Sequence, residues 1–307
     1  MFYFSKKKDK RREQQLAQRP RNSDAALLQG RMLLPLCTIE QCPKYLQDNR
    51  FILGGYRRGY STAMCLRSIF SLHNQTGNVW THLIGFFVLL LLSVHVVHVL
   101  IQPHLSHYVV FTIFSLGNLL CMLFSTMFHL FIGHHSVAVH DRLMSLDYFG
   151  ITCLVVASFV PPCYYVFHCH PQLQLGYLSM IAVLGSIGLF GPFFDSFVAE
   201  HFFWKRIGVY LLLVGSGIFP TIHTIVAFPM NHTSLPILRG VGLMFFLYAA
   251  GLVIYLSKVP ERWFPGRFDL WLHSHQLWHV FVLCSAVVHF FTCTAMYQQW
   301  EVMSGRC

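Results

Sequence analysis

The stretch LIGFFVLLLL at residues 83–92 carries no charged side chain and lies within a longer apolar segment at residues 80–100. A helix rises ~1.5 Å per residue, so a segment of this length crosses a hydrocarbon core of ~30 Å. Six further apolar segments follow, at roughly 108–132, 147–168, 173–194, 206–228, 238–259 and 274–298. The sequence therefore predicts an all-α membrane protein with seven transmembrane helices.

Composition excludes a soluble domain of this size. Of the 307 residues, 55% are hydrophobic and only 11% are charged, whereas soluble domains carry about 25% charged residues. The net charge of +10 comes largely from basic residues expected on one side of the membrane. It therefore indicates no nucleic-acid partner.

The distribution of basic residues predicts the orientation, because cytoplasmic segments beside membrane spans retain lysine and arginine. Seven spans place the two chain ends on opposite sides. On the side of the N-terminus lie 20 of the 22 basic residues, and the other two are Arg239 and Arg306. We expect a cytoplasmic N-terminus, the reverse of a G-protein-coupled receptor. Because the apolar stretch at 32–39 is short and contains Pro35, no cleavable signal peptide is expected.

Four parts are predicted along the chain. Residues 1–40 form a basic, disordered cytoplasmic tail, in which the run Lys6–Arg12 either rests on an anionic leaflet or is a solvated arm. Residues 41–73 form a cytoplasmic segment with a short interfacial helix at 61–73. Residues 74–300 form the seven-span domain, and residues 301–307 a short non-cytoplasmic tail.

Three histidines and one acid are predicted to lie at one depth in the membrane. His275 and His279 are four residues apart in the first two turns of the seventh span, so they face the same way. His129 precedes the end of the second span by about one turn, and Asp147 opens the third. Because ionisable groups in a membrane are costly and mark functional sites, we predict a metal bound by the three histidines. The alternative is that Asp147 caps its helix and the histidines donate to backbone carbonyls.

Three nitrogen ligands with an open fourth position are typical of catalytic zinc, which lowers the pKa of a bound water to about 7. Asp147 is then predicted to act on that water as a general base or orienting group rather than as a fourth ligand. Ser125 lies four residues before His129. Its hydroxyl either donates to a developing oxyanion or packs against a neighbouring helix.

The ten cysteines include no pair of C-x-x-C units that would indicate a thiolate metal site. Four of them fall on or near the predicted outer side: Cys163, Cys169, Cys293 and Cys307. A disulfide among these four is compatible with that compartment, and the pairing stays open.

These motifs, taken together, resemble the progestin and adipoQ receptor (PAQR) family, adiponectin-receptor-like branch, over about residues 40–300. The resemblance rests on Ser125-x-x-x-His129, Leu146-Asp147-Tyr148-x-Gly150, the loop from Lys258 to Asp269, His275-x-x-x-His279 and the entrance Asn74–His82.

The resemblance implies a zinc ion held by His129, His275 and His279, with Asp147 beside it, and hydrolysis of ceramide-like lipid amides. The family pattern usually has glutamate where this chain has Gln75. A neutral amide accepts hydrogen bonds but carries no charge, so a role for that carboxylate in holding the first span is in doubt. The zinc site is expected not to depend on it.

Three functions from different classes follow. The first is a zinc-dependent lipid amidohydrolase whose substrate enters from the bilayer. The second is a receptor that senses an extracellular hormone or lipid ligand. The third is a scaffold whose N-terminal tail tethers a cytoplasmic protein, with a structural zinc and no turnover. The plasma membrane and the Golgi are the expected locations.

Overall fold

The computed structural model describes residues 33–101, 104–227 and 234–303. The basic run Lys6–Arg12, most of the predicted tail and Cys307 lie outside these ranges. Residues 33–40, predicted to belong to the tail, are instead paired with the chain that follows. The backbone N–H of Cys37 donates to the carbonyl of Tyr56 at 2.8 Å, and that of Ile39 to Leu53 at 2.9 Å.

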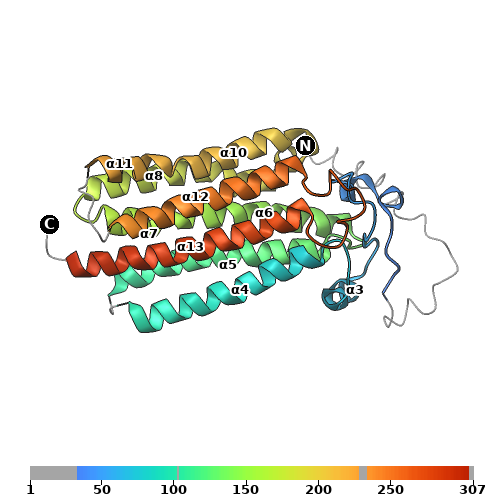
Figure 1. Cartoon of the computed structure of the whole chain (residues 1–307), viewed down its shortest axis with the longest axis horizontal. Helices are drawn as coiled ribbons and strands as arrows, with labels where there is room; N and C mark the ends of the chain where they lie inside the picture. Colours follow the sequence, from blue (N-terminus) through green and yellow to red (C-terminus); the bar gives the residue numbers. More distant parts are fainter. Residues whose placement is uncertain (1–32, 102–103, 228–233, 304–307) are drawn as a thin grey trace. The chain divides into compact units, whose positions relative to one another are not determined.

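Seven helical segments in the described residues are long and apolar enough to cross a membrane, as the sequence predicts. They span Thr76–Leu100, Leu105–Phe131, Val137–Val166, Pro171–Phe193, Glu200–Ala227, Ser234–Ser257 and Ser274–Met303. Figure 1 labels their principal helices, which are α4 (Thr76–His95), α5 (Leu105–Phe131), α6 (Val137–Ser158), α7 (Val160–Val166), α8 (Pro171–Phe190), α10 (Phe203–Gly215), α11 (Ile218–Ala227), α12 (Ser234–Ser257) and α13 (Ser274–Met303).

Two of the seven segments are broken near their middle. The third segment changes from α6 to α7 just before Pro161 and Pro162, and the fifth changes from α10 to α11 between Gly215 and Pro220. Proline lacks the N–H that would bond to the carbonyl four residues earlier, so it interrupts the helical ladder. In a membrane the freed carbonyls need other donors.

The predicted start of the third span is wrong. Helix α6 begins at Val137, ten residues before Asp147. At ~1.5 Å per residue, Asp147 therefore lies ~15 Å along the helix rather than at its first turn. The helix extends past the apolar stretch through polar residues, including Asp141 and Arg142, which hydropathy alone excludes. This also removes the alternative in which Asp147 caps the helix.

The short helix predicted before the first span is present. Helix α3 (Thr62–Arg67) continues into a 3-10 turn, η3 (Ser68–Phe70). Ser61 caps α3, because its side chain accepts a hydrogen bond from the backbone N–H of Met64. Phe70 is 85% exposed, as expected of an apolar side chain at a membrane interface.

The chain divides into two compact units, which are described separately below. The first comprises Met1–Thr81, Ser125–Met144 and Gly251–Val280. The second comprises His82–Phe124, Ser145–Ala250 and Phe281–Cys307. A core in the first unit packs Tyr60, Met64 and Leu130, and one in the second packs Phe159, Ile181 and Leu213.

Of the four cysteines considered for a disulfide, Cys169 is disulfide-bonded. Cys163 and Cys293 are free, buried thiols. The prediction of a disulfide within this group of cysteines is therefore confirmed for Cys169 alone, in the part of the chain that the structure describes.

Candidate metal centre

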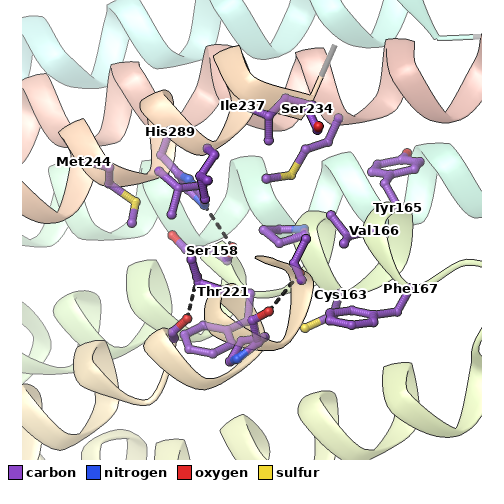
Figure 2. Close-up of a pocket in the computed structure, with 18 of the residues that line it drawn as sticks. Ser158, Cys163, Tyr165, Val166, Phe167, Thr221, Ser234, Ile237, Met244 and His289 are labelled. Carbon is purple, nitrogen blue, oxygen red and sulfur yellow. Dashed lines mark hydrogen bonds between the residues drawn. The ribbon is translucent and has the colours of Figure 1, made fainter. Parts of the chain in front are cut away.

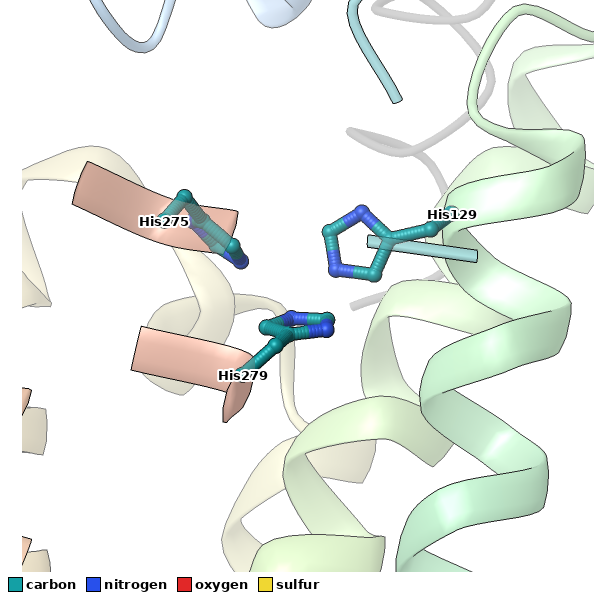
Figure 3. A group of neighbouring side chains, drawn as sticks. All are labelled: His129, His275 and His279. Atoms are coloured by element: carbon teal, nitrogen blue, oxygen red, sulfur yellow. The ribbon is translucent and has the colours of Figure 1, made fainter. Parts of the chain in front are cut away.

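The imidazoles of His129, His275 and His279 converge in the first unit (Figure 3). One nitrogen from each ring lies within 4.8 Å of the other two. The ring centroids of His129 are 5.0 Å from those of His275 and 4.7 Å from those of His279, and the last two are 4.9 Å apart. Three residues from two helices thus form a nearly equilateral triangle, as their predicted depth requires.

The positions of the three histidines follow from their helices. His129 lies two residues before the end of α5, and His275 and His279 lie on the first two turns of α13. Only 2% of His129 and 3% of His279 are exposed, while His275 is half-buried. The edge of the His275 ring also meets Tyr255, at 5.3 Å between centroids. The site is therefore largely closed to its surroundings.

Two of the three imidazoles have an outer partner that fixes their tautomer. Nδ1 of His129 lies 2.7 Å from Oε1 of Gln75, and Nδ1 of His279 lies 3.2 Å from the backbone oxygen of Asn78. Both partners are acceptors, so each Nδ1 carries the proton and each Nε2 keeps its lone pair. Metal-binding histidines in proteins are usually oriented in this way.

Gln75 is part of this site, so the expectation that the zinc site does not depend on it is wrong. Its Oε1 also accepts a hydrogen bond from Nδ2 of Asn78 at 2.6 Å, which holds the amide with its oxygen toward His129. The sequence showed a departure from the family pattern at Gln75, but not that the side chain reaches His129. That contact needs α4 and α5 to be placed together.

Helix α4 reaches the site because Gly77 allows close packing. A Cβ atom at Gly77 would lie 2.4 Å from Cδ of Gln276, closer than real Cβ contacts allow. The missing side chain lets the first turn of α4 approach the first turn of α13. Gln75 and Asn78 are thereby brought beside the histidines.

A buried arginine, which the sequence analysis did not single out, holds the end of α5. Arg57 donates to the backbone oxygens of His129 at 2.6 Å and Leu130 at 2.8 Å, and to Oγ of Ser68 at 2.5 Å. The last carbonyls of a helix have no intrahelical donor, so a cation there is favourable. Burial lowers the pKa of Arg57 to about 10, and the guanidinium stays charged at neutral pH. Arg57 therefore fixes the backbone that carries His129.

The start of α13 is held by a buried acid. Glu261 is 0% exposed and accepts hydrogen bonds from the backbone N–H of Ser274 at 2.7 Å and from Nδ2 of Asn49 at 2.9 Å. The hydroxyl of Ser274 also donates to Glu261. A carboxylate at a helix N-terminus satisfies free N–H groups and complements the helix dipole. Glu261 lay in a loop quoted only for its family resemblance, and no spacing pointed to this role.

The two other predicted site residues have different positions. Ser125 is buried on α5, one turn from His129 and in the same unit. Asp147 is half-buried on α6 and belongs to the second unit. It is not among the residues whose ligand atoms converge. The catalytic roles of both residues stay predictions.

The donor set suits a divalent metal of the first transition row. Imidazole nitrogen is a ligand for zinc, copper, iron and nickel, and three protein ligands leave a position for a further group. The two assigned Nε2 lone pairs, on His129 and His279, are those a metal would use. In the described part of the chain, no other group of three histidine, cysteine or acidic residues is arranged in this way.

Seven membrane-spanning helices and a buried triad of histidines define a class of heptahelical membrane proteins with a metal-binding site. Residues 70–290 match the model of the family described as haemolysin-III related. The chain is 36% identical over 275 residues to the adiponectin receptor protein of Drosophila melanogaster, covering 89% of this chain and 62% of that protein. It is 37% identical over 264 residues to progestin and adipoQ receptor-like protein 1 of Caenorhabditis elegans, covering 84% and 60%.

A plant relative extends the comparison. Heptahelical transmembrane protein 3 of Arabidopsis thaliana is 32% identical over 302 residues, covering 84% of this chain and 86% of that protein. The chain therefore belongs to the haemolysin-III-related family, among its adiponectin-receptor-like PAQR members. It spans about 60% of the length of the fly and nematode relatives.

Proposed function

We propose that this chain is a zinc-dependent lipid amidohydrolase that cleaves ceramide-like amides within the membrane. One observation supports the proposal most strongly. Three buried imidazoles have converging nitrogens, and outer hydrogen bonds direct the Nε2 lone pairs of two of them inward. Such a ligand set with an open position is the arrangement of catalytic zinc, whereas structural sites usually have four protein ligands.

The proposal includes the orientation and the source of the substrate. The excess of lysine and arginine on one side supports a cytoplasmic N-terminus, which puts the triad near the cytoplasmic face. A lipid amide would then reach it from the bilayer. The plasma membrane and the Golgi are the two locations that we propose.

The chemistry needs one water and one proton transfer. When bound, zinc supplies a Lewis acid that lowers the pKa of water at its open position to about 7. In the hydrolysis the oxygen of water joins the acyl carbon, the C–N bond breaks, and a fatty acid and a sphingoid amine are released. We assign to the Asp147 carboxylate the transfer of the proton from water to the leaving nitrogen. We assign to the Ser125 hydroxyl a hydrogen bond to the amide oxygen as its charge develops.

A receptor is the second candidate function. The fly relative is named an adiponectin receptor protein, which favours a role in sensing an extracellular hormone or lipid ligand. In that case the metal holds helices together, and the N-terminal region tethers a cytoplasmic protein without turnover. Deletion of residues 1–32 separates the two functions, because a scaffold loses its function and a hydrolase keeps it.

Metal and product analysis of the purified chain tests the proposal. We expect about one zinc ion per wild-type chain and release of fatty acid from ceramide, with both lost in His275→Ala. His98→Ala serves as a matched control, because His98 is an exposed histidine. Equal zinc in wild type and His275→Ala would refute the site. Zinc in the wild type without any turnover would refute the hydrolase and leave the receptor.

A further inference from the structure

A second site is formed by an internal cavity of about 560 Å³ in the second unit (Figure 2). Its walls come from the end of α6 and from α7, α11, α12 and α13. The volume lies within the ~300–1,000 Å³ of small-molecule sites in proteins. All of its lining residues belong to the second unit, so the cavity can be described apart from the histidine triad.

The break between α6 and α7 places a histidine at this cavity. Pro162 has no N–H, so the carbonyl of Ser158, four residues earlier, lacks its helical donor. Nε2 of His289, on α13, lies 3.0 Å from that oxygen, as the dashed line to Ser158 in Figure 2 shows. The thiol of Cys293 lies 3.5 Å from the same nitrogen. His289 therefore repairs a backbone bond that proline removed.

This bond determines the chemistry of the other ring nitrogen. A carbonyl only accepts, so Nε2 of His289 carries the proton and Nδ1 keeps a lone pair. His289 is 5% exposed, and its Nδ1 has no hydrogen-bond partner among the described residues. One edge of the ring is closed by Phe114, whose centroid is 5.6 Å away. A buried acceptor without a donor is costly, and a ligand that donates a hydrogen bond removes that cost.

The remaining walls set the shape and polarity of the ligand. From His289 the lining continues along α13 to Met303, a rise of ~21 Å at ~1.5 Å per residue. Along α12 the walls are largely apolar, with Val241 and Met244 among them. The hydroxyls of Thr221 and Thr224 already donate to their own helix. The cavity thus combines one acceptor with a long apolar chamber.

We propose that this cavity binds a neutral lipid alcohol, whose hydroxyl donates to Nδ1 of His289 and whose apolar body fills the chamber toward Met303. An ionised fatty acid fits less well, because a carboxylate has no hydrogen to donate and would face the lone pair of Nδ1. A single water fits less well too, because a buried water needs two to four polar partners. Long-chain alcohols and sterols share the required chemistry.

Photolabelling of the full chain in detergent tests this proposal. The probe is a long-chain primary alcohol with a mid-chain diazirine, and the labelled residues are located by mass spectrometry. We expect label on cavity-lining peptides and competition by unlabelled hexadecanol. Its methyl ether, which has the same chain but no donor, should compete about tenfold less well, as expected for one hydrogen bond. A sterol competitor distinguishes the two kinds of alcohol.

Variants separate the hydrogen bond from simple occupancy. His289→Phe removes the acceptor, so the alcohol and its ether should compete equally there. Cys293→Ala is the matched control and should keep the tenfold preference. Val241→Trp should reduce labelling by filling the chamber without touching His289. It keeps the test decisive if His289→Phe fails to fold.

Three results would overturn the proposal. These are equal competition by alcohol and ether in the wild type, an unchanged preference in a folded His289→Phe protein, and unchanged labelling in Val241→Trp. The inference does not rest on the proposed hydrolase. His275→Ala, which should lose zinc, should still bind the probe.

Discussion

The histidine triad in the first unit and His289 in the second use the same side chain in opposite tautomers. In the triad, acceptors hold Nδ1 of His129 and His279 and leave each Nε2 free to bind. At His289 a backbone carbonyl holds Nε2 and leaves Nδ1. Three converging nitrogens suit a cation, whereas a single lone pair in an apolar chamber suits a hydrogen-bond donor. The acceptor beside a buried histidine therefore decides what it can bind.

Removal of one ligand from the triad should have the largest effect. We expect His129→Ala to lower zinc affinity by more than the ~100-fold upper limit for loss of an outer partner, with loss of ceramide turnover. Metal titration of the purified protein measures this. His98→Ala, at an exposed position on the first span, should bind zinc like the wild type. Unchanged affinity in His129→Ala would break the distinction between the two sites.

Asp147→Asn should separate metal binding from chemistry. The amide cannot take a proton from water, so turnover should fall by about 100- to 10,000-fold, the range typical of a general base. Zinc content should stay at the wild-type level, because the three histidines are intact. Turnover and metal content are measured on the same preparation, with Asp195→Asn, at an exposed position, as the control. Full activity in Asp147→Asn would remove this residue from the mechanism.

Gln75→Ala tests whether the outer partner matters as the tautomer argument requires. Loss of the acceptor beside Nδ1 of His129 should weaken zinc binding by about 10- to 100-fold. Gln75→Glu keeps an acceptor and adds charge, so it should bind zinc at least as tightly as the wild type. Gln172→Ala, at an exposed position, is the control for metal titration. Equal affinity in all four proteins would show that Gln75 does not tune the site.

A third buried histidine predicts a pH dependence of stability. Nδ1 of His73 accepts from the backbone N–H of Gln75 at 3.1 Å, and Nε2 lies 3.1 Å from the carbonyl of Ser68. Burial, followed by the charge of Arg57, lowers the pKa of His73 from 6.5 to about 3. Below pH 6.5 the unfolded chain therefore binds a proton that the folded chain does not.

The stability that neutral His73 supplies should thus be complete above pH 6.5 and decline as the pH falls toward 3. Thermal unfolding across this pH range measures the decline. His73→Gln should flatten it, while His98→Gln should keep the wild-type slope. The same slope in His73→Gln would assign the acid sensitivity to other groups.

The smallest expected effects are those of each site on the other. His289→Phe should keep the zinc content of the wild type, since it alters no ligand and no outer partner of the triad. A matching loss of zinc in this variant would show that the two histidine sites are not independent.

The sequence predicted the spans well because crossing a membrane requires long, uncharged segments. It also predicted the triad, because a spacing of four residues puts His275 and His279 on one face and the depth of His129 follows from helix order. The helix around Asp147 was misplaced because hydropathy marks where a chain is apolar, not where a helix begins. Arg57 and Glu261 were missed because their partners are backbone groups, which have no sequence signature.

The sequence by itself determined the class of this protein, its number of spans, its family and the three histidines of the metal site. Those features depend on residue type and on spacing within single helices. Only the tertiary structure decided which atoms face each other. It joined Gln75 to His129, set Arg57 on the end of α5, and turned His289 toward a carbonyl that a proline had freed. Such contacts connect residues far apart in the chain, and packing alone brings them within hydrogen-bond distance.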